Sequence, residues 1–557
     1  MVQKEDKEPR CFMCDRVATI KCPGCSDVWF CCWTHGRIHY REEVGQCFPW
    51  RVDTLPVVGR VMRTTRPVKA GETLFMEEPI VHGPNQVGSP ICLSCYASVS
   101  LDYFCDKCGY PMCDQECATH PTHLEECKIL SRGERPVFDK NGETEAYHCI
   151  LPLRLLLLSR QDPERFSLSD HLMDHEEDRA GSDDWRTTER TVVDNLVVKC
   201  KAGQHEQMTV DEVRRALGVL EVNCYEVYSF IKKSASHSCG LRGCFPAASL
   251  LSHSCVANSR HIWGTEPPYT NTCIATVDME AGTEVVTSYV HPTTALLRRR
   301  YKLKAGWYFE CGCRRCQSQT ELGTDHSTLV CPACGQPRLV PRQPLVLGSL
   351  WQCLDCGHEV TEQEVLVTLD KLSTGIKTII DNNRYDANMW LQMLDMSLKI
   401  VHHHHDVVTE ISKFLIPILC RGPGVKTDDF PLSLVRRKLE LATWQMEVLD
   451  VIDPGYSKSR AKILYEIVET KMYLSQKDTF KEENLIELVE KCREQIDQVI
   501  LIIERLKPDQ GFETMILKAS KNLKMILTFM IQQIHNGSFE QKEWRNESWY
   551  LLDLCSL

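Results

Sequence analysis

Cysteines separated by two residues recur along this chain, and this spacing constrains its fold more than any other feature. The sequence has 31 cysteines among 557 residues, and its first residues are polar. With no apolar secretory segment there, we expect a reducing compartment, the cytoplasm, the nucleus or both. In such a compartment closely spaced cysteines are typical of metal sites rather than of disulfides. The sequence therefore predicts several small zinc-bound modules.

The most regular group of ligand pairs lies within residues 90–128. Its spacing supplies eight ligands, enough for two tetrahedral zinc ions. The eight are Cys92, Cys95, Cys105, Cys108, Cys113, Cys117, His123 and Cys127. A segment this short has too few apolar residues for a core, so metal binding should supply its folding energy. Residues 11–47 repeat the pattern with Cys11, Cys14, Cys22, Cys25, Cys31, His35 and Cys47.

Two further cysteine groups follow in the second half of the chain. Cys311, Cys313 and Cys316 provide three thiolates, so a tetrahedral site needs a fourth ligand from elsewhere. The other group has two Cys-x2-Cys pairs separated by 18 residues, which is zinc-ribbon spacing. Its ligands are Cys331, Cys334, Cys353 and Cys356. The proline-rich stretch 337–344 between the pairs suits a hairpin of short strands.

Outside these blocks, hydrophobic spacing divides the chain into strand and helix segments. Residues 51–82 and 245–290 show short runs punctuated by glycine and proline, which predicts strands. Residues 145–235 and the chain from 362 onward show helical spacing, with 174–178 as a solvated loop or helix face. Within 431–452, apolar residues three and four apart predict one buried helix face, formed by Leu432, Val435, Leu439, Ala442, Met446 and Leu449.

The C-terminal helices are predicted to form antiparallel hairpins. A second helix is predicted at 484–506, and Asp453-Pro454-Gly455 is predicted to be a turn between two helices. The hairpins resemble TPR repeats, although no clean repeat of about 34 residues is present. The run His402–His405 is interpreted as a histidine-rich helix start, with a metal site as the alternative.

Several strings in this sequence resemble the SET methyltransferases. Ser252-His253-Ser254-Cys255-Val256-Ala257-Asn258 resembles their NHSC-x-PN signature, and the stretch 282–289, ending in Tyr289, resembles their GEELxxxY element. The group at 311–316 resembles the post-SET CxCxxC motif, and 59–61 with 69–72 resemble the opening strands. The block at 91–128 is similar to a MYND finger. A MYND finger inserted after those strands is typical of SET–MYND (SMYD) proteins, and two such fingers with a ribbon resemble the arthropod branch.

The resemblance implies how the ligands are shared. In the second block Cys92, Cys95, Cys113 and Cys117 would hold one ion, and Cys105, Cys108, His123 and Cys127 the other. In the first, Cys11, Cys14, Cys31 and His35 would form one site, and Cys22, Cys25, His39 and Cys47 the other. Glu43 stands where the family has a ligand histidine, so Glu43 is the alternative to His39. Cys255 would complete the site of Cys311, Cys313 and Cys316.

The activity implied by the resemblance is methyl transfer from S-adenosylmethionine to a protein lysine. Tyr289 would be the catalytic tyrosine. The implied cofactor-binding residues are Gly59, Arg60, Asn223, Ser252, His253 and Phe309. Expected partners are protein substrates or peptide ligands, such as histones or proline-containing motifs. The net charge of −11 argues against sequence-specific DNA binding, and the sequence lacks a long apolar run, so we expect no membrane association. A monomer is expected.

Four positions of the SET motifs depart from the family pattern, of which Ala257, in place of a proline, should matter least. Ser252 replaces an asparagine, and a hydroxyl lacks the two-sided hydrogen bonding of an amide. Val61 replaces the second glycine of the opening turn, and Trp307 replaces a second channel tyrosine. Two functions therefore stay open. One is an active methyltransferase; the other is a catalytically degenerate zinc protein that acts as a protein-interaction or transcription-regulatory scaffold.

These predictions describe an α+β multidomain chain with a β-rich SET fold, an inserted MYND finger, small zinc modules and an all-α, TPR-like C-terminal domain. The predicted segments are a degenerate MYND-type finger (8–50), the first SET part (51–90), the MYND finger (91–128), a helical insert (129–240), the SET core (241–295), the post-SET site (296–320), the ribbon (328–360) and the helical domain (361–557).

Overall fold

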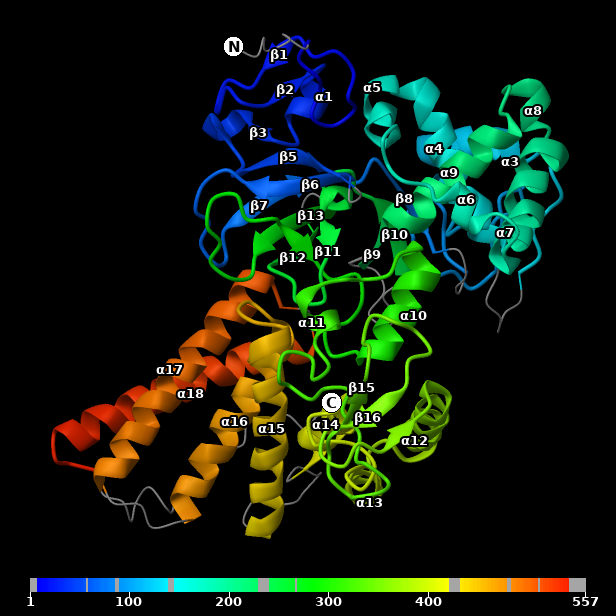
Figure 1. Cartoon of the computed structure of the whole chain (residues 1–557). Coiled ribbons are helices and arrows are strands. Elements are labelled where there is room, and N and C mark those ends of the chain that lie inside the picture. The colour runs from blue at the N-terminus through cyan, green and yellow to red at the C-terminus, as the bar shows by residue number, and fades with distance from the viewer. Residues whose placement is uncertain are drawn as a thin grey trace, which may run out of the picture. The chain divides into compact units, whose positions relative to one another are not determined.

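The computed structural model describes residues 8–56, 59–85, 90–138, 145–228, 240–265, 268–419, 431–477, 482–508 and 511–539. The chain divides into two compact units. Figure 1 shows the helices and strands of both. The first unit comprises Met1–Ser252, Ser259–Val286 and Gly306–Tyr308. The second comprises His253–Asn258, Thr287–Ala305 and Phe309–Leu557. The finer division into eight segments stays a prediction.

The first unit begins with a small module made of short elements. Its two hairpins are β1–β2 and β3–β4, with one helical turn on either side of β3. The elements are β1 (Ile20–Lys21), β2 (Trp29–Phe30), α1 (Trp33–Gly36), β3 (Tyr40–Arg41), η1 (Glu42–Val44) and β4 (Gln46–Cys47). Elements of two to four residues cannot build a core by themselves, which is why the cysteine ligands of this module matter for its folding.

Antiparallel strands form the centre of the first unit. The pair β5–β6, the sheet β12-β13-β7 and the sheet β8-β10-β9 are separate ladders. Their bounds are β5 (Trp50–Leu55), β6 (Gly59–Thr64), β7 (Thr73–Glu77), β8 (Val81–Pro84), β9 (Cys224–Tyr228), β10 (Gly240–Cys244), β12 (Ser259–Thr265) and β13 (Pro268–Ala275). Strands are therefore confirmed in both regions predicted to contain them. The division of the sequence between the two units falls within two short strands, β11 (Ser252–His253) and β14 (Val286–Thr287).

The regular elements between β8 and β9 are helices, which begin at Gln115. They are α2 (Gln115–Ala118), α3 (Pro121–Leu130), η2 (Ala146–Cys149), α4 (Ile150–Gln161), α5 (Pro163–Phe166), η3 (Ser167–Ser169), α6 (Glu176–Arg179), α7 (Asp183–Thr188), the π-helix η4 (Glu189–Lys199), α8 (Ala202–His205) and α9 (Val210–Asn223). A capping box between Thr209 and Glu212 starts α9. The predicted helical region is wrong at its end, because residues 224–228 form strand β9, which pairs antiparallel with β10. Aromatic and branched residues such as Tyr225 and Val227 favour strands. Residues 229–239 lie outside the described residues.

The second unit joins a small three-stranded sheet to a series of helices. The sheet has the order β15-β16-β17, with β15 (Leu339–Pro341), β16 (Trp351–Cys353) and β17 (Glu359–Val360). The helices are α10 (Leu296–Trp307), α11 (Arg314–Gln317), α12 (Glu362–Asn383), α13 (Ala387–Ser397), α14 (Asp406–Ile418), α15 (Leu432–Ile452), α16 (Lys458–Lys477), α17 (Glu482–Leu506) and α18 (Phe512–His535). The last residues of α10 belong to the first unit.

Consecutive helices from α13 to α18 pack against each other, which confirms the predicted helical C-terminal region. Lys521 pairs with Glu504 and Lys524 with Asp497, so α17 and α18 run antiparallel. The likeness to TPR repeats stays a prediction. His405 caps α14 by accepting a hydrogen bond from the backbone N–H of Val407, which confirms the histidine run as a helix start.

The predicted buried face of α15 is partly wrong. Leu432 is 38% exposed, and Leu439 and Met446 are half-buried. The face that the helix buries instead contains Val435, Lys438, Leu441, Ala442, Gln445, Val448, Leu449 and Ile452. Lys438 is tolerated there because its Nζ lies 2.7 Å from Glu466 and 3.2 Å from Glu469 on the neighbouring α16. Pattern alone gave no reason to expect a buried lysine.

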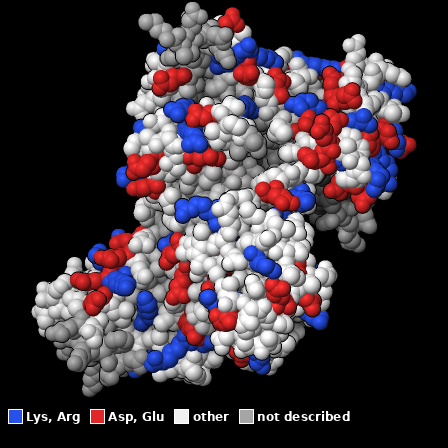
Figure 2. Space-filling view, in the orientation of Figure 1, with Lys and Arg blue, Asp and Glu red and all other residues white. Residues whose placement is uncertain are grey.

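Charged side chains of both signs lie on the surface of the molecule. In the view of Figure 2, acidic and basic side chains are mixed over much of the visible face. Acidic residues cluster at the starts of α6 and α7, at Glu176, Glu177, Asp178, Asp183 and Asp184. Within the described part of the chain, the structure contains no helix with the length and apolar character needed to span a membrane.

Candidate metal centres and cofactor-site residues

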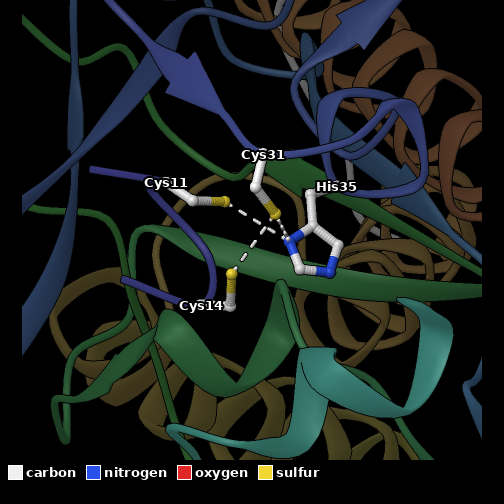
Figure 3. Close-up of side chains that lie close together, drawn as sticks. All are labelled: Cys11, Cys14, Cys31 and His35. Carbon is white, nitrogen blue, oxygen red and sulfur yellow. Dashed lines mark hydrogen bonds between the residues drawn. The ribbon is translucent and has the colours of Figure 1, made fainter. Parts of the chain in front are cut away.

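The first module brings two sets of four ligand atoms together. In one set, the sulfurs of Cys11 and Cys31 lie 3.3 and 3.4 Å from Nδ1 of His35, and the sulfurs of Cys14 and Cys31 are 3.5 Å apart (Figure 3). Zinc held at ordinary bond lengths would place tetrahedral sulfur and nitrogen ligands about 3.5–3.8 Å apart. The geometry therefore fits a metal ion coordinated by Nδ1 of His35.

The opposite ring nitrogen of His35 is held by the helical segment that follows α4. Nε2 lies 3.1 Å from the backbone oxygen of Glu164 and 3.1 Å from the hydroxyl oxygen of Ser167. A metal-ligating histidine commonly donates its second N–H to such an acceptor, which fixes its tautomer and orientation. His35 has this arrangement.

The second set in this module contains His39 rather than Glu43. The ligand atoms of Cys22, Cys25, His39 and Cys47 all lie within 4.8 Å of one another. His39 is 1% exposed, and burial lowers the pKa of its imidazole to about 4, which keeps the ring neutral and able to ligate. Glu43 lies on η1 and is exposed. The structure thus places the histidine, not the carboxylate, with the three thiols.

The block at 91–128 also forms two interleaved groups. Cys92, Cys95, Cys113 and Cys117 form one, and Cys105, Cys108, His123 and Cys127 form the other. In the second group Nε2 of His123 lies 3.6 Å from the sulfur of Cys108. The sharing of ligands in both blocks is the same as the resemblance implies.

Six of the Cys-x2-Cys pairs, those of the two finger blocks and of the ribbon, are closed by the same backbone turn. The residue after the second cysteine has a positive φ, and its N–H donates to the carbonyl of the first cysteine at 2.9–3.0 Å. Glycine occupies this position at Gly109, Gly335 and Gly357. Asp15, Ser26 and Tyr96 occupy it in the other pairs, where an L-residue adopts a left-handed conformation at some cost. This turn brings the two sulfurs of a pair to one side of the backbone.

The three-cysteine group finds its fourth thiol in the second unit. The sulfur of Cys255 lies 3.8 Å from that of Cys311 and 3.5 Å from that of Cys316, and Cys313 completes the group. The four sulfurs fit the tetrahedral spacing expected around zinc. This metal ion would carry four thiolates, so the centre would have a net charge of −2.

Two buried arginines lie behind this four-cysteine group. Nη2 of Arg299 is 3.7 Å from the sulfur of Cys316, and Nη1 of Arg315 donates to the backbone oxygen of Cys255 at 3.2 Å. Both arginines pair with Glu321 at 2.6 Å, and all three side chains are fully buried. Burial by itself would raise the pKa of the Glu321 carboxyl, but the two guanidinium groups lower it to about 2. The arginines therefore supply positive charge beside an anionic centre.

The ribbon cysteines also lie in pairs on the small sheet. The sulfurs of Cys331 and Cys356 are 3.6 Å apart, and those of Cys334 and Cys353 are 3.7 Å apart. The predicted hairpin between the two pairs is the β15–β16 ladder. Soft thiolates in a tetrahedral arrangement select zinc over calcium or magnesium.

Four predicted cofactor-binding residues lie in the first unit. Gly59 has φ +86°, and a Cβ atom there would meet nothing within 4 Å, so the backbone faces open space. The Arg60 guanidinium donates to the backbone oxygens of Met13 at 2.6 Å and His171 at 2.9 Å. Arg60 thus ties the first module to the unit, a role that sequence reasoning missed. Ser252 lies on β11 and is half-buried.

Asn223 is the last residue of α9 and is 9% exposed. Its Nδ2 donates to the backbone oxygens of Met173 and Val219, each at 2.8 Å. Both amide hydrogens of Asn223 therefore already donate hydrogen bonds. An ammonium group of a cofactor could still donate to its Oδ1.

The other three predicted residues form an aromatic group in the second unit. The ring of His253 lies 5.2 Å from that of Tyr289 and 5.8 Å from that of Phe309, measured between centroids. Tyr289 and Phe309 meet edge to face at 6.3 Å. Burial raises the pKa of Tyr289 to about 12, so its hydroxyl keeps its proton at neutral pH.

Several residues that matter to these centres carried no clear sequence signal. Arg299, Glu321 and Glu126 support ligands through contacts that depend on packing. Arg315 was the most accessible to prediction, since it lies inside the Cys311–Cys316 motif.

Comparison with curated proteins found relatives that are named as SET-domain proteins. No family model matches the chain. The SET domain-containing protein SmydA-8 of Drosophila melanogaster is 28% identical in isoform A and 30% in isoform B, over 321 residues. This covers 56% of the present chain, 65% of isoform A and 67% of isoform B. The chain therefore spans about two thirds of the length of these curated relatives.

Two further proteins have lower sequence identity to this chain. The N-lysine methyltransferase SMYD2 of Gallus gallus is 27% identical over 269 residues, 47% of this chain and 58% of its own. A solved SET domain of LSMT, bound to lysine and AdoHcy, covers 89% of this chain and 88% of its own at 10% identity and a TM-score of 0.27, too low to relate the two folds. The similarity to SmydA-8, together with the named relative SMYD2, shows that this chain belongs to the SET and MYND domain-containing (SMYD) protein family.

Proposed function

We propose that this protein is an S-adenosylmethionine-dependent protein-lysine methyltransferase of the SET–MYND type. The observation that carries the proposal is the position of Cys255. This residue of the His-Ser-Cys string lies 56 positions before Cys311, yet its sulfur joins the Cys311 group. By the resemblance to SET enzymes, a metal ion bound by these four cysteines would hold the segment of His253 and Cys255 against the segment that begins at Cys311.

The aromatic group beside this centre supports the same activity. Phe309 follows α10 and precedes Cys311, and Tyr289 and His253 lie near it. When bound, S-adenosylmethionine supplies a methyl group whose bond to sulfur breaks as its bond to the neutral lysine nitrogen forms, with the amine proton leaving to solvent. Tyr289 keeps a protonated hydroxyl that can orient the amine, and Phe309 offers an apolar face for the adenine.

The remaining cofactor residues are proposed from the family resemblance. Gly59 would let the backbone approach the cofactor, because its side is open and its positive φ suits glycine. Asn223 would accept a hydrogen bond from the amino group through Oδ1. Arg60 would act by its backbone, since its guanidinium is committed to Met13 and His171.

The zinc modules are proposed to be structural and to dock partners. We assign zinc to the four-ligand groups, MYND character to the blocks at 8–50 and 91–128, and TPR-like character to the C-terminal helices. Protein substrates are proposed, with histones and proline-containing peptides as candidates, and the protein is proposed to act as a monomer in the cytoplasm, the nucleus or both.

Cofactor binding tests the proposal directly. S-adenosylmethionine at millimolar concentration is expected to raise the melting temperature of the zinc-loaded full-length protein, because a ligand that binds only the folded state stabilises it. No shift would reject the methyltransferase assignment. If the shift appears, Tyr289→Phe should keep it and abolish transfer of labelled methyl groups to protein. Tyr385→Phe, at a tyrosine that is 78% exposed, is the matched control and should retain transfer.

A further inference from the structure

The two ring nitrogens of His253 are engaged by two different parts of the second unit. Nδ1 accepts a hydrogen bond from the backbone N–H of Tyr289 at 3.0 Å. Nε2 lies 3.3 Å from the sulfur of Cys255. A ring nitrogen that accepts a hydrogen bond carries no proton, so the proton of the neutral ring is on Nε2. His253 therefore donates to the sulfur of Cys255, and one tautomer satisfies both contacts.

Two further contacts fix the chain next to His253. The N–H of Ser254 donates to the carbonyl of Thr287 at 3.0 Å, which brings the strand before Tyr289 beside the His-Ser-Cys string. Cys255 belongs to the four-thiol group with Cys311. The imidazole thus spans the distance between a metal ligand and the backbone of the tyrosine.

We propose that His253 is a positioning residue that ties the main chain of Tyr289 to the sulfur of Cys255. The four-cysteine centre would thereby set the position of the tyrosine hydroxyl, and the N–H to sulfur hydrogen bond would in turn stabilise the thiolate as a ligand. The role of Tyr289 in catalysis rests on the proposed function. The two contacts by which His253 connects Tyr289 to Cys255 do not depend on that function.

A different role would leave a different signature. If His253 acted only by touching the adenine, its replacement would raise KM for the cofactor and leave the metal centre unchanged. A positioning residue instead alters kcat at constant cofactor KM and changes the reactivity of the ligand sulfur.

Two near-isosteric variants separate the two contacts. In His253→Asn, Oδ1 can take the position of Nδ1 and accept from Tyr289, while the donor to sulfur is lost. In His253→Gln, the side-chain NH2 can take the position of Nε2 and donate to Cys255, while the acceptor for Tyr289 is lost. His205→Asn, at an exposed histidine on α8, is the control.

The readouts are site-resolved thiol alkylation and steady-state kinetics, both on the full-length zinc-loaded protein. Mass spectrometry follows alkylation of the peptide that contains Cys255 in the presence of a chelator. For His253→Asn we expect alkylation about 10-fold faster than in the wild type and a kcat at least about 3-fold higher than that of His253→Gln. For His253→Gln we expect alkylation at the wild-type rate and kcat about 10-fold lower, with cofactor KM unchanged.

The proposal is overturned if only KM changes, if both variants change both readouts alike, or if neither readout changes. If either variant fails to fold, the proposed role of His253 is tested by hydrogen exchange in the wild-type protein. Chelation should then expose the amide of Tyr289 at the rate at which Cys255 is alkylated, and a protected amide after alkylation refutes the tie. Because alkylation and exchange require no turnover, a protein that binds no S-adenosylmethionine would reject the proposed function while these measurements still test the role of His253.

Discussion

His123 and Glu126 lie three residues apart on α3, with Nδ1 of the histidine 3.3 Å from Oε1 of the glutamate, and both side chains are fully buried. The glutamate also receives two hydrogen bonds from Arg154, at 2.7 and 2.9 Å. Burial by itself would raise the pKa of Glu126, but the charge of Arg154 and the contact with His123 lower it. The ligand histidine is therefore oriented by a carboxylate that stays ionised.

Removing this carboxylate should weaken the metal site that contains His123. For Glu126→Gln we expect metal affinity at the Cys105 site to fall roughly 10–100-fold, as for other residues that hold a ligand histidine. Zinc retained after dialysis against graded chelator measures the effect. Glu125→Gln is the control, since Glu125 pairs with Lys128 on the surface. Equal zinc loss from both variants would contradict the prediction.

Replacing His39 should remove one metal ion from the first module, whereas replacing Glu43 should leave that ion bound. His39 lies with Cys22, Cys25 and Cys47, whereas Glu43 is exposed. Zinc content of the purified protein should therefore fall by one equivalent in His39→Ala and stay at the wild-type value in Glu43→Gln. The reverse result would make the carboxylate the ligand.

The stability of the first unit should depend on pH through Glu77. Burial raises the pKa of this carboxyl to about 7, although it accepts hydrogen bonds from the backbone N–H groups of Ala247 and Ala248. An acid with a raised folded pKa binds its proton more tightly in the folded state. Its contribution therefore favours folding at low pH and is lost as the pH rises from about 4.5 to about 7.

This effect is to be measured as a difference between the wild type and Glu77→Gln, because the difference removes the contributions of all groups that the two proteins share. Between pH 5.5 and 8, kept above the range where zinc thiolates protonate, the wild type should lose on the order of 2 kcal/mol relative to the variant. Melting temperatures across this range provide the comparison. Parallel curves for the two proteins would show that Glu77 is already ionised at pH 5.5.

Lys438 should be important for the C-terminal helices despite being a lysine on a buried face. Lys438→Met keeps the apolar chain but leaves Glu466, which is 3% exposed, without the ammonium 2.7 Å away. Breaking a buried ion pair from one side typically costs about 3–5 kcal/mol. Urea unfolding monitored by helix content should show the loss. Arg437→Met, which removes partly exposed ion pairs, should cost about 1 kcal/mol or less.

If the proposed function is correct, restoring the family residue at Ser252 should improve cofactor binding. An asparagine can both donate and accept, and one such hydrogen bond contributes roughly 1–3 kcal/mol when its partner is buried. Calorimetry should therefore find tighter S-adenosylmethionine binding by Ser252→Asn than by the wild type. Ser252→Ala should show no gain. Unchanged affinity in Ser252→Asn would mean that the serine does not limit binding.

Much of the clustering of potential metal ligands could be predicted from the sequence, because a Cys-x2-Cys pair is a local feature. The turn after Cys334 needs only the N–H of Gly335 and the carbonyl of Cys331, four residues apart. Strands were likewise predicted at 51–82 from local pattern. The end of the predicted helical region was wrong, because Tyr225 and Val227 become strand residues only by pairing with β10. Their partners, Gly243 and Leu241, lie 18 and 14 positions further along the chain.

The sequence by itself determined which side chains are chemically able to bind metal and how they pair over short distances. Only the tertiary structure decided that His39 rather than Glu43 lies with the thiols, that Cys255 meets Cys311, and that Lys438 rather than Leu439 is buried. The reason is physical. Ligand type and turn geometry depend on a few neighbouring residues, whereas burial and contacts across 56 positions depend on how whole elements pack.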